Sequence, residues 1–192
     1  MANITLEGEF VTLRPLAVDD AALTLAWRQG GRAAYLNVGA QSVEQQANWI
    51  ASRPPSEYNF IIELKDGRPV GMVSLSGVDT THRHAEPGRF LIGDAEAVQG
   101  VPAAVEAMRL IYDLAFGTLE LERVHGSIPA DNTLMIKWQK FMGMTEEGRL
   151  RNHFFINGKF QDAVWFGMLA EEYRAKVQPK MEVFIKAARR QK

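Results

Sequence analysis

A glycine turn between a predicted strand and a predicted helix is the stretch of this sequence best suited to bind an anion. The apolar run at residues 89–93 is typical of a strand, and apolar residues at helical spacing run from Val101 to Phe116. Pro102 suits the first turn of that helix, where a missing N–H costs nothing. Because a helix start leaves backbone N–H groups unpaired and has a favourable dipole, it binds phosphate readily. The candidate anion site comprises Gln99, Gly100, Val101, Pro102, Ala103 and Ala104.

Other residue types that carry chemistry are sparse. The sequence has no cysteine, which excludes disulfides, thiolate catalysis and cysteine-based zinc sites. His82, His84 and His125 are candidate bases, but loop histidines are more often solvated. No pair of them has metal-ligand spacing together with an acidic partner, so we expect no metal site.

The composition is that of a globular protein with one domain, or with one domain and an appendage. Of its 192 residues, 46% are apolar and 23% charged, so the chain can build a real core. The net charge of −1 argues against nonspecific nucleic-acid binding, which needs a basic surface. The start of the chain lacks the apolar core of a signal peptide, and no apolar run is long enough to cross a bilayer. We therefore expect a cytoplasmic protein with no nucleic-acid or membrane partner.

Strands and helices alternate around the anion site. Strands are expected at residues 4–16, 59–64, 69–78, 85–92, 121–128, 144–150, 153–156 and 160–169. Helices are expected after a cap at Asp19 and Asp20, from Ser42, over 101–116, after a cap at Asp131 and Asn132, and over 170–192 with an interruption near Pro179. Asn157 and Gly158 are expected to form a hairpin turn. This order predicts one domain of the α/β class, a mixed sheet flanked by helices.

The long helix after the glycine turn is predicted to be mostly buried. Only Glu106, Arg109 and Asp113 give it a polar face. Gly117 suits the position just past the helix end.

Several short motifs follow the glycine turn in a fixed order. They are Glu106-Ala107, Phe116, Leu-Glu-Arg-Val at 121–124, Asn132, Gly143-Met144, Glu-Gly-Arg-Leu-Arg at 147–151 and Asp162. Their order and spacing resemble the GNAT acetyltransferase superfamily, and within it the RimJ/RimL branch of ribosomal-protein N-terminal acetyltransferases. The resemblance covers about residues 4–173. It implies a GNAT-like domain at 1–173 with a mostly antiparallel sheet, followed by a C-terminal helical tail at 174–192.

The resemblance also implies how a cosubstrate is bound. Acetyl-CoA would place its pyrophosphate on residues 99–104, and no metal is expected. Leu91, Ile92 and Gly93 would end the strand that pairs with the pantetheine arm, with one backbone N–H polarising the thioester carbonyl. Asn132 caps its helix, bonds the cosubstrate arm, or does both.

Glu86 is the candidate general base. Attack on a thioester needs a neutral amine, whereas an alkyl amine has a pKa near ~10. A carboxylate on the strand beside the thioester would take the proton directly or through water. The resemblance supports this position, since the ribosomal branch has Glu two residues before a glycine, as at Glu86 and Gly88. The alternatives are a surface glutamate at this position and a histidine as the base.

Four residues in or beside the first two helices are candidates for the acceptor site. The resemblance implies that these helices wall the acceptor cleft, and the candidates are Trp27, Arg28, Tyr35 and Trp49. We expect one tryptophan in the core and the other in the cleft wall. Arg28 either meets an acidic acceptor or lies on the surface. Asp162 is expected to orient a neighbouring strand or loop.

The sequence departs from the family pattern at several positions, which keeps alternative functions open. Pro102 removes one amide from the phosphate cradle, and Ala97 replaces the usual Gln or Arg. Gln139 stands where many members carry a proton-donating Tyr, and Met135 where the ribosomal branch often has Ser.

We expect an N-acetyltransferase acting on a primary amine of a small molecule by direct attack in a ternary complex. The alternatives are a protein N-terminal acetyltransferase and a non-catalytic acyl-CoA-binding regulatory domain. The expected partners are acetyl-CoA and an amine acceptor. The oligomeric state stays open, a homodimer included.

Overall fold

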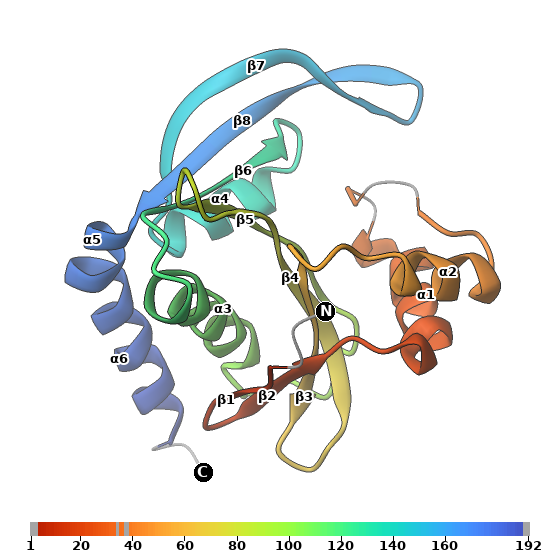
Figure 1. The fold of residues 1–192 in the computed structure, drawn as a ribbon, viewed down its shortest axis with the longest axis horizontal. Coiled ribbons are helices and arrows are strands. Elements are labelled where there is room, and N and C mark those ends of the chain that lie inside the picture. The colour runs from red at the N-terminus through yellow and green to blue at the C-terminus, as the bar shows by residue number, and fades with distance from the viewer. Residues whose placement is uncertain (1–3, 34, 37–38, 190–192) are drawn as a thin grey trace.

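The computed structural model describes residues 4–33, 35–36 and 39–189 and has a central sheet with helices on both faces (Figure 1). Its strands are β1 (Leu6–Glu7), β2 (Val11–Pro15), β3 (Tyr58–Leu64), β4 (Pro69–Asp79), β5 (His84–Ile92), β6 (Arg123–Pro129), β7 (Thr145–Ile156) and β8 (Lys159–Leu169). The α-helices are α1 (Ala21–Gln29), α2 (Val43–Ala51), α3 (Ala103–Asp113), α4 (Thr133–Phe141), α5 (Ala170–Glu172) and α6 (Gln178–Arg189). Four turns of other helical types are η1 (Val18–Asp20), η2 (Gly31–Ala33), η3 (Leu114–Thr118) and η4 (Tyr173–Val177). None of these described helices is both long and apolar enough to cross a membrane.

The sheet confirms the predicted fold class. Its strand order is β1-β2-β3-β4-β5-β6-β8-β7, and among the described strands every neighbouring pair except β5 and β6 is antiparallel. The parallel pair β5 and β6 is joined in the described chain only at His84–Arg123 and Ala85–Val124. Beyond these two pairs β5 continues along β4 and β6 along β8, so the sheet opens in its middle.

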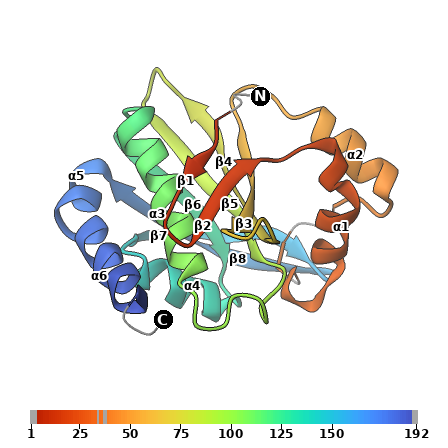
Figure 2. The same ribbon diagram turned by 90° about the horizontal axis from the view of Figure 1, so that it is seen from below.

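Each face of the sheet carries its own core. α3 and α6 cover one face, and α1 and α2 cover the other (Figures 1 and 2). In β3, Phe60 and Ile62 belong to the larger core, which includes α3, whereas Ile61 belongs to the smaller core beside α1 and α2. Because successive side chains point to opposite faces, a strand buried on both faces is continuously apolar.

Glu106 is not part of a polar face of α3, so that prediction is wrong. The residue is 0% exposed. Its Oε1 accepts a hydrogen bond from the backbone N–H of Glu9 at 2.8 Å. Its Oε2 accepts from the N–H groups of Phe10 and Val11, at 2.6 and 2.8 Å. The buried carboxylate therefore ties the turn between β1 and β2 to α3.

The start of the chain also differs from its prediction. Residues 4–16 form two strands rather than one, because the chain turns back after Gly8, whose N–H donates to the carbonyl of Val11 at 2.9 Å. Asp20 precedes α1, but its carboxylate does not cap that helix. Instead both of its oxygens accept from the guanidinium of Arg14, at 2.7 Å each, so the predicted Asp cap is wrong.

Three helix boundaries shift by local rearrangements. Pro102 is the N-cap residue of α3, one position before the first helical turn predicted for it. Gly117 lies within the π-helical turn η3 that extends α3, not beyond its end. The C-terminal helix changes to the π-helical turn η4, which ends at Val177 and leads directly into α6, so the irregularity lies two residues before Pro179, near the predicted position.

The C-terminal helices pack on the main core. Tyr173, Val177, Met181 and Ile185 are buried in the same cluster as the apolar face of α3. A boundary at residue 173 stays a prediction, and residues 190–192 of the expected tail lie outside the described residues.

The hairpin of β7 and β8 arches over one end of the sheet (Figure 1). The two predicted segments at 144–150 and 153–156 form the single strand β7, with a register shift between Leu150 and Phe154. The carboxylate of Asp162 accepts from the N–H of Asn152 across this shift, at 3.1 Å. The prediction that Asp162 orients a neighbouring strand is therefore confirmed.

Candidate active site

The opening between β5 and β6 forms a cleft of about 1040 Å³. Its walls come from β5, β6, α4, one residue pair of α3, and the segment from α1 to α2. The predicted site residues that line it are Arg28, Tyr35, Trp49, Glu86, Leu91, Ile92, Ala104 and Asn132. Trp27, Gly93 and residues 99–103 are not among its lining residues.

A β-bulge in β5 shapes one wall of the cleft. The register between β4 and β5 shifts between Met72 and Ser74, and Arg89 has a left-handed φ of 49°. Such bulges bend a strand and re-aim its side chains. Next to the bulge, the ring of Phe90 stacks on Trp138 of α4, with centroids 5.8 Å apart.

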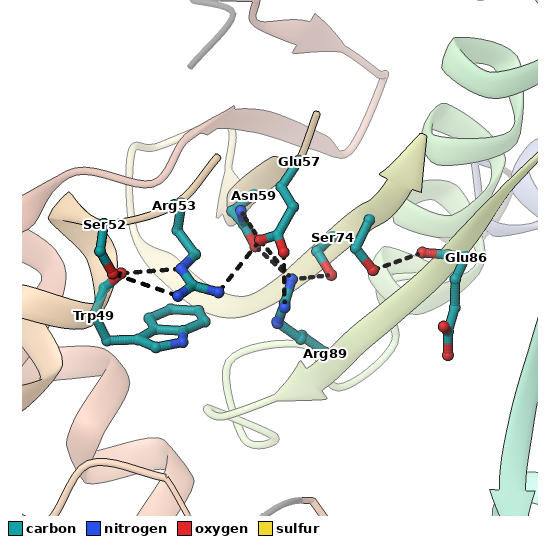
Figure 3. Close-up of polar contacts among 9 residues, drawn as sticks. Trp49, Ser52, Arg53, Glu57, Asn59, Ser74, Glu86 and Arg89 are labelled. Atoms are coloured by element: carbon teal, nitrogen blue, oxygen red, sulfur yellow. Dashed lines mark hydrogen bonds and ion pairs between the residues drawn. The ribbon is translucent and has the colours of Figure 1, made fainter. Parts of the chain in front are cut away.

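The side chain of Arg89 is held by a polar cluster (Figure 3). Its guanidinium donates to both carboxylate oxygens of Glu57, at 3.1 and 3.3 Å, and to Oδ1 of Asn59 at 3.1 Å. These contacts fix a non-glycine residue in a backbone region that costs energy.

Beyond the bulge, the edge of β5 faces the cleft. On the other edge, Leu91 and Ile92 pair with β4. The N–H of Gly93 donates to the carbonyl of Val70 at 2.9 Å. The ring of Trp27 lies so close to Gly93 that a Cβ there would overlap it. Trp27 therefore packs against the strand end, and the edge that faces the cleft belongs to Leu91 and Ile92.

The glycine turn leads into the cleft at the start of α3. Gly100 has a φ of 72°, a conformation that suits glycine, and a Cβ there would meet no atom within 4 Å. Val101 donates its N–H to the carbonyl of Val98 at 3.0 Å. The N–H groups of Ala103 and Ala104 belong to the first turn of α3, which has no helical acceptor for them. Whether an anion binds at this turn therefore stays a prediction, which rests on the N–H groups of Ala103 and Ala104.

Glu86 projects from β5 into the open middle of the sheet. Figure 3 shows its carboxylate pointing away from the cluster around Arg89. It lies over Gly126 of β6, where a Cβ would be 3.6 Å from its Oε1. No hydrogen bond or ion pair among the described residues involves this carboxylate. Burial raises the pKa of Glu86, an effect that Arg89 and His153 partly offset.

His84 and His125 are neighbours across β5 and β6. Nε2 of His125 lies 3.3 Å from Nδ1 of His84, and the His125 ring stacks on Trp165 with centroids 5.3 Å apart. Burial, followed by His84 and Arg123, lowers the pKa of His125, which favours its neutral imidazole. His125 also lines the cleft, so it remains an alternative base.

α4 carries the two positions, Met135 and Gln139, at which the sequence departs from the family pattern described above. Met135 and Gln139 line the cleft, and the buried Oε1 of Gln139 has no hydrogen-bond partner in the described structure. Asn132 caps the helix as predicted, because its Oδ1 accepts from the N–H of Met135 at 3.1 Å. Its amide N–H groups remain able to donate into the cleft.

The α1–α2 segment forms the wall of the cleft that carries the predicted acceptor residues. Trp49, Arg28 and Tyr35 line the cleft there. The Tyr35 hydroxyl donates to the backbone carbonyl of Asp131 at 3.4 Å, which links this segment to the start of α4.

Some cleft residues were not predicted, notably Arg89, Phe90 and Trp138. One local signal for the bulge exists, since Pro87 and Gly88 interrupt the apolar strand, and such residues often mark bulges. No group of three or more His, Cys, Asp or Glu side chains in the described residues is arranged to hold a metal ion.

The chain matches known acetyltransferases over most of its length. Residues 11–145 match the family model "Acetyltransferase (GNAT) domain". The chain is 30% identical to spermidine N(1)-acetyltransferase of Escherichia coli K12 over 131 residues, 68% of each protein. It is 32% identical over 110 residues, 57% of this chain and 58% of the relative, to a Bacillus subtilis protein assigned provisionally as a ribosomal N-acetyltransferase.

Solved structures agree with this fold. A GCN5-related N-acetyltransferase from Brucella melitensis superposes with a TM-score of 0.82 at 22% identity, covering 96% of this chain and 86% of that one. Because the relatives carry both spermidine and ribosomal names, membership of the RimJ/RimL branch stays a prediction. The chain belongs to the GNAT family and is an acetyl-CoA-dependent N-acetyltransferase.

Proposed function

We propose that the enzyme transfers the acetyl group of acetyl-CoA to a primary amine of a small molecule, with Glu86 as the general base. The observation that carries this proposal is the position of the Glu86 carboxylate. It is partly buried and projects into the cleft where the sheet opens. A carboxylate with a raised pKa is a better proton acceptor than an exposed one.

The reaction is a direct attack in a ternary complex. The amine nitrogen bonds to the thioester carbon while Glu86 takes the N–H proton, and the C–S bond breaks to release the CoA thiolate. A thiol has a pKa near ~8.5, so its thiolate leaves without a dedicated acid. Gln139 and Met135, which replace the usual donors, are therefore compatible with turnover.

The cosubstrate would lie along the open edge of Leu91 and Ile92. Its pyrophosphate would lie on the first-turn N–H groups of α3, near Gly100 and Ala104. Asn132 would donate from its free amide to the pantetheine arm.

Replacing Gly100 with glutamate is expected to abolish stabilisation by acetyl-CoA. The new carboxylate would stand where the pyrophosphate is proposed to bind, whereas the wild type at 100 times Kd would gain about 2.7 kcal/mol. Gly100→Ala is the matched control, because it shares the backbone strain of a left-handed φ without the charge. The unfolding temperatures of Gly100→Glu and Gly100→Ala, with and without acetyl-CoA, measure the stabilisation of each variant. Equal stabilisation of the two variants would place the cosubstrate elsewhere.

A small-molecule acceptor is supported by the spermidine-named relative and by the low net charge. Docking on a ribosome needs a broad basic surface. In a CoA-release assay, small primary amines are expected to be better substrates than peptides beginning with Ser or Ala. The panel includes polyamines and amino-sugar nucleotides, and a heat-denatured sample gives the background. Clear preference for the peptides would favour the protein N-terminal alternative, while binding without turnover of any amine would favour a non-catalytic role.

A further inference from the structure

The acceptor end of the cleft is rich in arginine. Among the described residues that line the cleft, three are arginines, Arg28, Arg32 and Arg89, and only Glu86 carries a carboxylate. Arg28 and Arg32 lie on the α1–α2 segment, and Arg89 lies at the β5 bulge beside it; these parts of the cleft lining are called the acceptor wall below. The charge of this wall is therefore positive.

The carboxylate behind this wall does not neutralise it. Glu57 is shared between Arg89, at 3.1 Å, and Arg53, at 3.7 Å. The guanidinium groups of Arg53 and Arg89 also lie 4.4 and 5.3 Å from the ring centroid of Trp49 (Figure 3). Two cations thus share one anion around an aromatic ring, which leaves a surplus of one positive charge.

Arg28 adds a further cation beside this cluster. It is partly buried and packs against Gly39, where a Cβ would be 2.9 Å from its Nη2. Burial, and secondly the guanidinium of Arg89, lowers the pKa of Arg28. A guanidinium that is removed from water near a like charge is stabilised by an anion that binds it, most of all by one with two oxygens.

We propose that the acceptor is a small primary amine that also carries an anionic oxyacid group, bound by Arg28 and Arg89 while the amine faces Glu86. Arg89 and Glu86 are three residues apart on β5 and both line the cleft, so the two ends of one molecule would be recognised there. A polyamine would bring further positive charge against the arginines and find only one carboxylate in the cleft lining described above. The inference rests on the proposed acetyl transfer in this cleft and names its substrate class.

The test compares amines of matched length in the CoA-release assay. 4-Aminobutanoate, butylamine and 1,4-diaminobutane share a four-carbon amine and differ in the charge of the far end. 3-Aminopropylphosphonate distinguishes a phosphonate from a carboxylate as the anionic group. One of the two anionic amines is expected to have a kcat/KM about 10- to 100-fold above that of butylamine, the range of one charge-assisted contact.

Arg28→Met is expected to bring that ratio to within about 3-fold of one. Arg151→Met removes the same charge from an exposed position on β7 outside the cleft lining and should keep the wild-type ratio. Better use of the diamine than of both anionic amines would overturn the inference and leave acetyl transfer standing.

If no amine supports CoA release, the proposed function fails, and binding decides the inference. Calorimetric titration of the enzyme–CoA complex with the same four amines compares their affinities. If neither anionic amine binds more tightly than butylamine, the inferred substrate class is wrong.

Discussion

Replacing Glu86 with glutamine is expected to lower kcat by about 10²-fold or more at neutral pH, which corresponds to about 2.7 kcal/mol of transition-state stabilisation. Glutamine keeps the shape of the side chain over Gly126 but cannot take the proton from the amine. Turnover should recover in part at high pH, where the amine loses its proton to solvent.

The pH dependence of the wild-type rate is an independent test of Glu86 as the base. Burial raises the pKa of Glu86, so the wild-type rate should fall as the pH drops through that raised value. This acidic limb should disappear in Glu86→Gln. Unchanged turnover in the variant would contradict the assignment and return attention to His125.

Although Glu86→Gln should lower activity, it should not lower the stability of the fold. A carboxyl group whose pKa is raised on folding stabilises the fold when protonated, and that contribution is lost as the pH rises through the folded pKa. At pH 7 the ionised Glu86 therefore disfavours the fold slightly, and Glu86→Gln should unfold at the same or a higher temperature. A loss of activity without a loss of stability separates a catalytic role from a structural one.

Replacing Glu106 with alanine is expected to lower the free energy of unfolding by about 3–5 kcal/mol. The change leaves three backbone N–H groups, of Glu9, Phe10 and Val11, without the carboxylate that accepts from them. It also leaves a cavity beneath the β1–β2 turn. In a chain of this size, such a loss lowers Tm by roughly 6–20 °C.

Two control variants test whether the loss of stability comes from the hydrogen bonds of the Glu106 carboxylate. Glu106→Gln keeps the volume but turns one acceptor into a donor, so a smaller loss of about 1–3 kcal/mol is expected. Glu182→Ala removes an exposed carboxylate that pairs with Lys186 on α6, and should change stability by less than about 0.5 kcal/mol. Chemical denaturation of the three variants provides the measurement, and a loss below about 1 kcal/mol for Glu106→Ala would refute this account.

The features that sequence predicted well are governed by neighbouring residues. Ser42 accepts from the N–H of Gln45 at the start of α2, and Asn132 does the same for α4. Asn157 and Gly158 both adopt the left-handed conformation expected of their hairpin turn. In each case the side chain and its backbone partner lie within three residues, so the sequence pattern contains the whole interaction.

The features that escaped prediction depend on residues far apart in the sequence. The acceptors and donors around Glu106 are 95 to 97 positions apart. The side chain of Arg89 is fixed by Glu57 and Asn59, 32 and 30 positions away. Asp20 is only six positions from Arg14, but no helix-capping pattern includes an arginine that binds both of its oxygens. The arginine-rich acceptor wall likewise exists only once α1 and the β5 bulge are brought together.

The opening between β5 and β6 gives the sheet two interior edges in addition to the usual outer ones. An unpaired strand edge is ordinarily a hazard, because another chain can add a strand to it and start aggregation. Here the interior edges face each other across a cleft that side chains of α4 and the α1–α2 segment also line. The outer edge, β7, is long and exposed, and its charged residues, Arg149 and Arg151 among them, and its register shifts discourage such pairing. The same architecture thus keeps unpaired main-chain groups inside a lined cleft, away from the exposed edge where strands of separate molecules could meet.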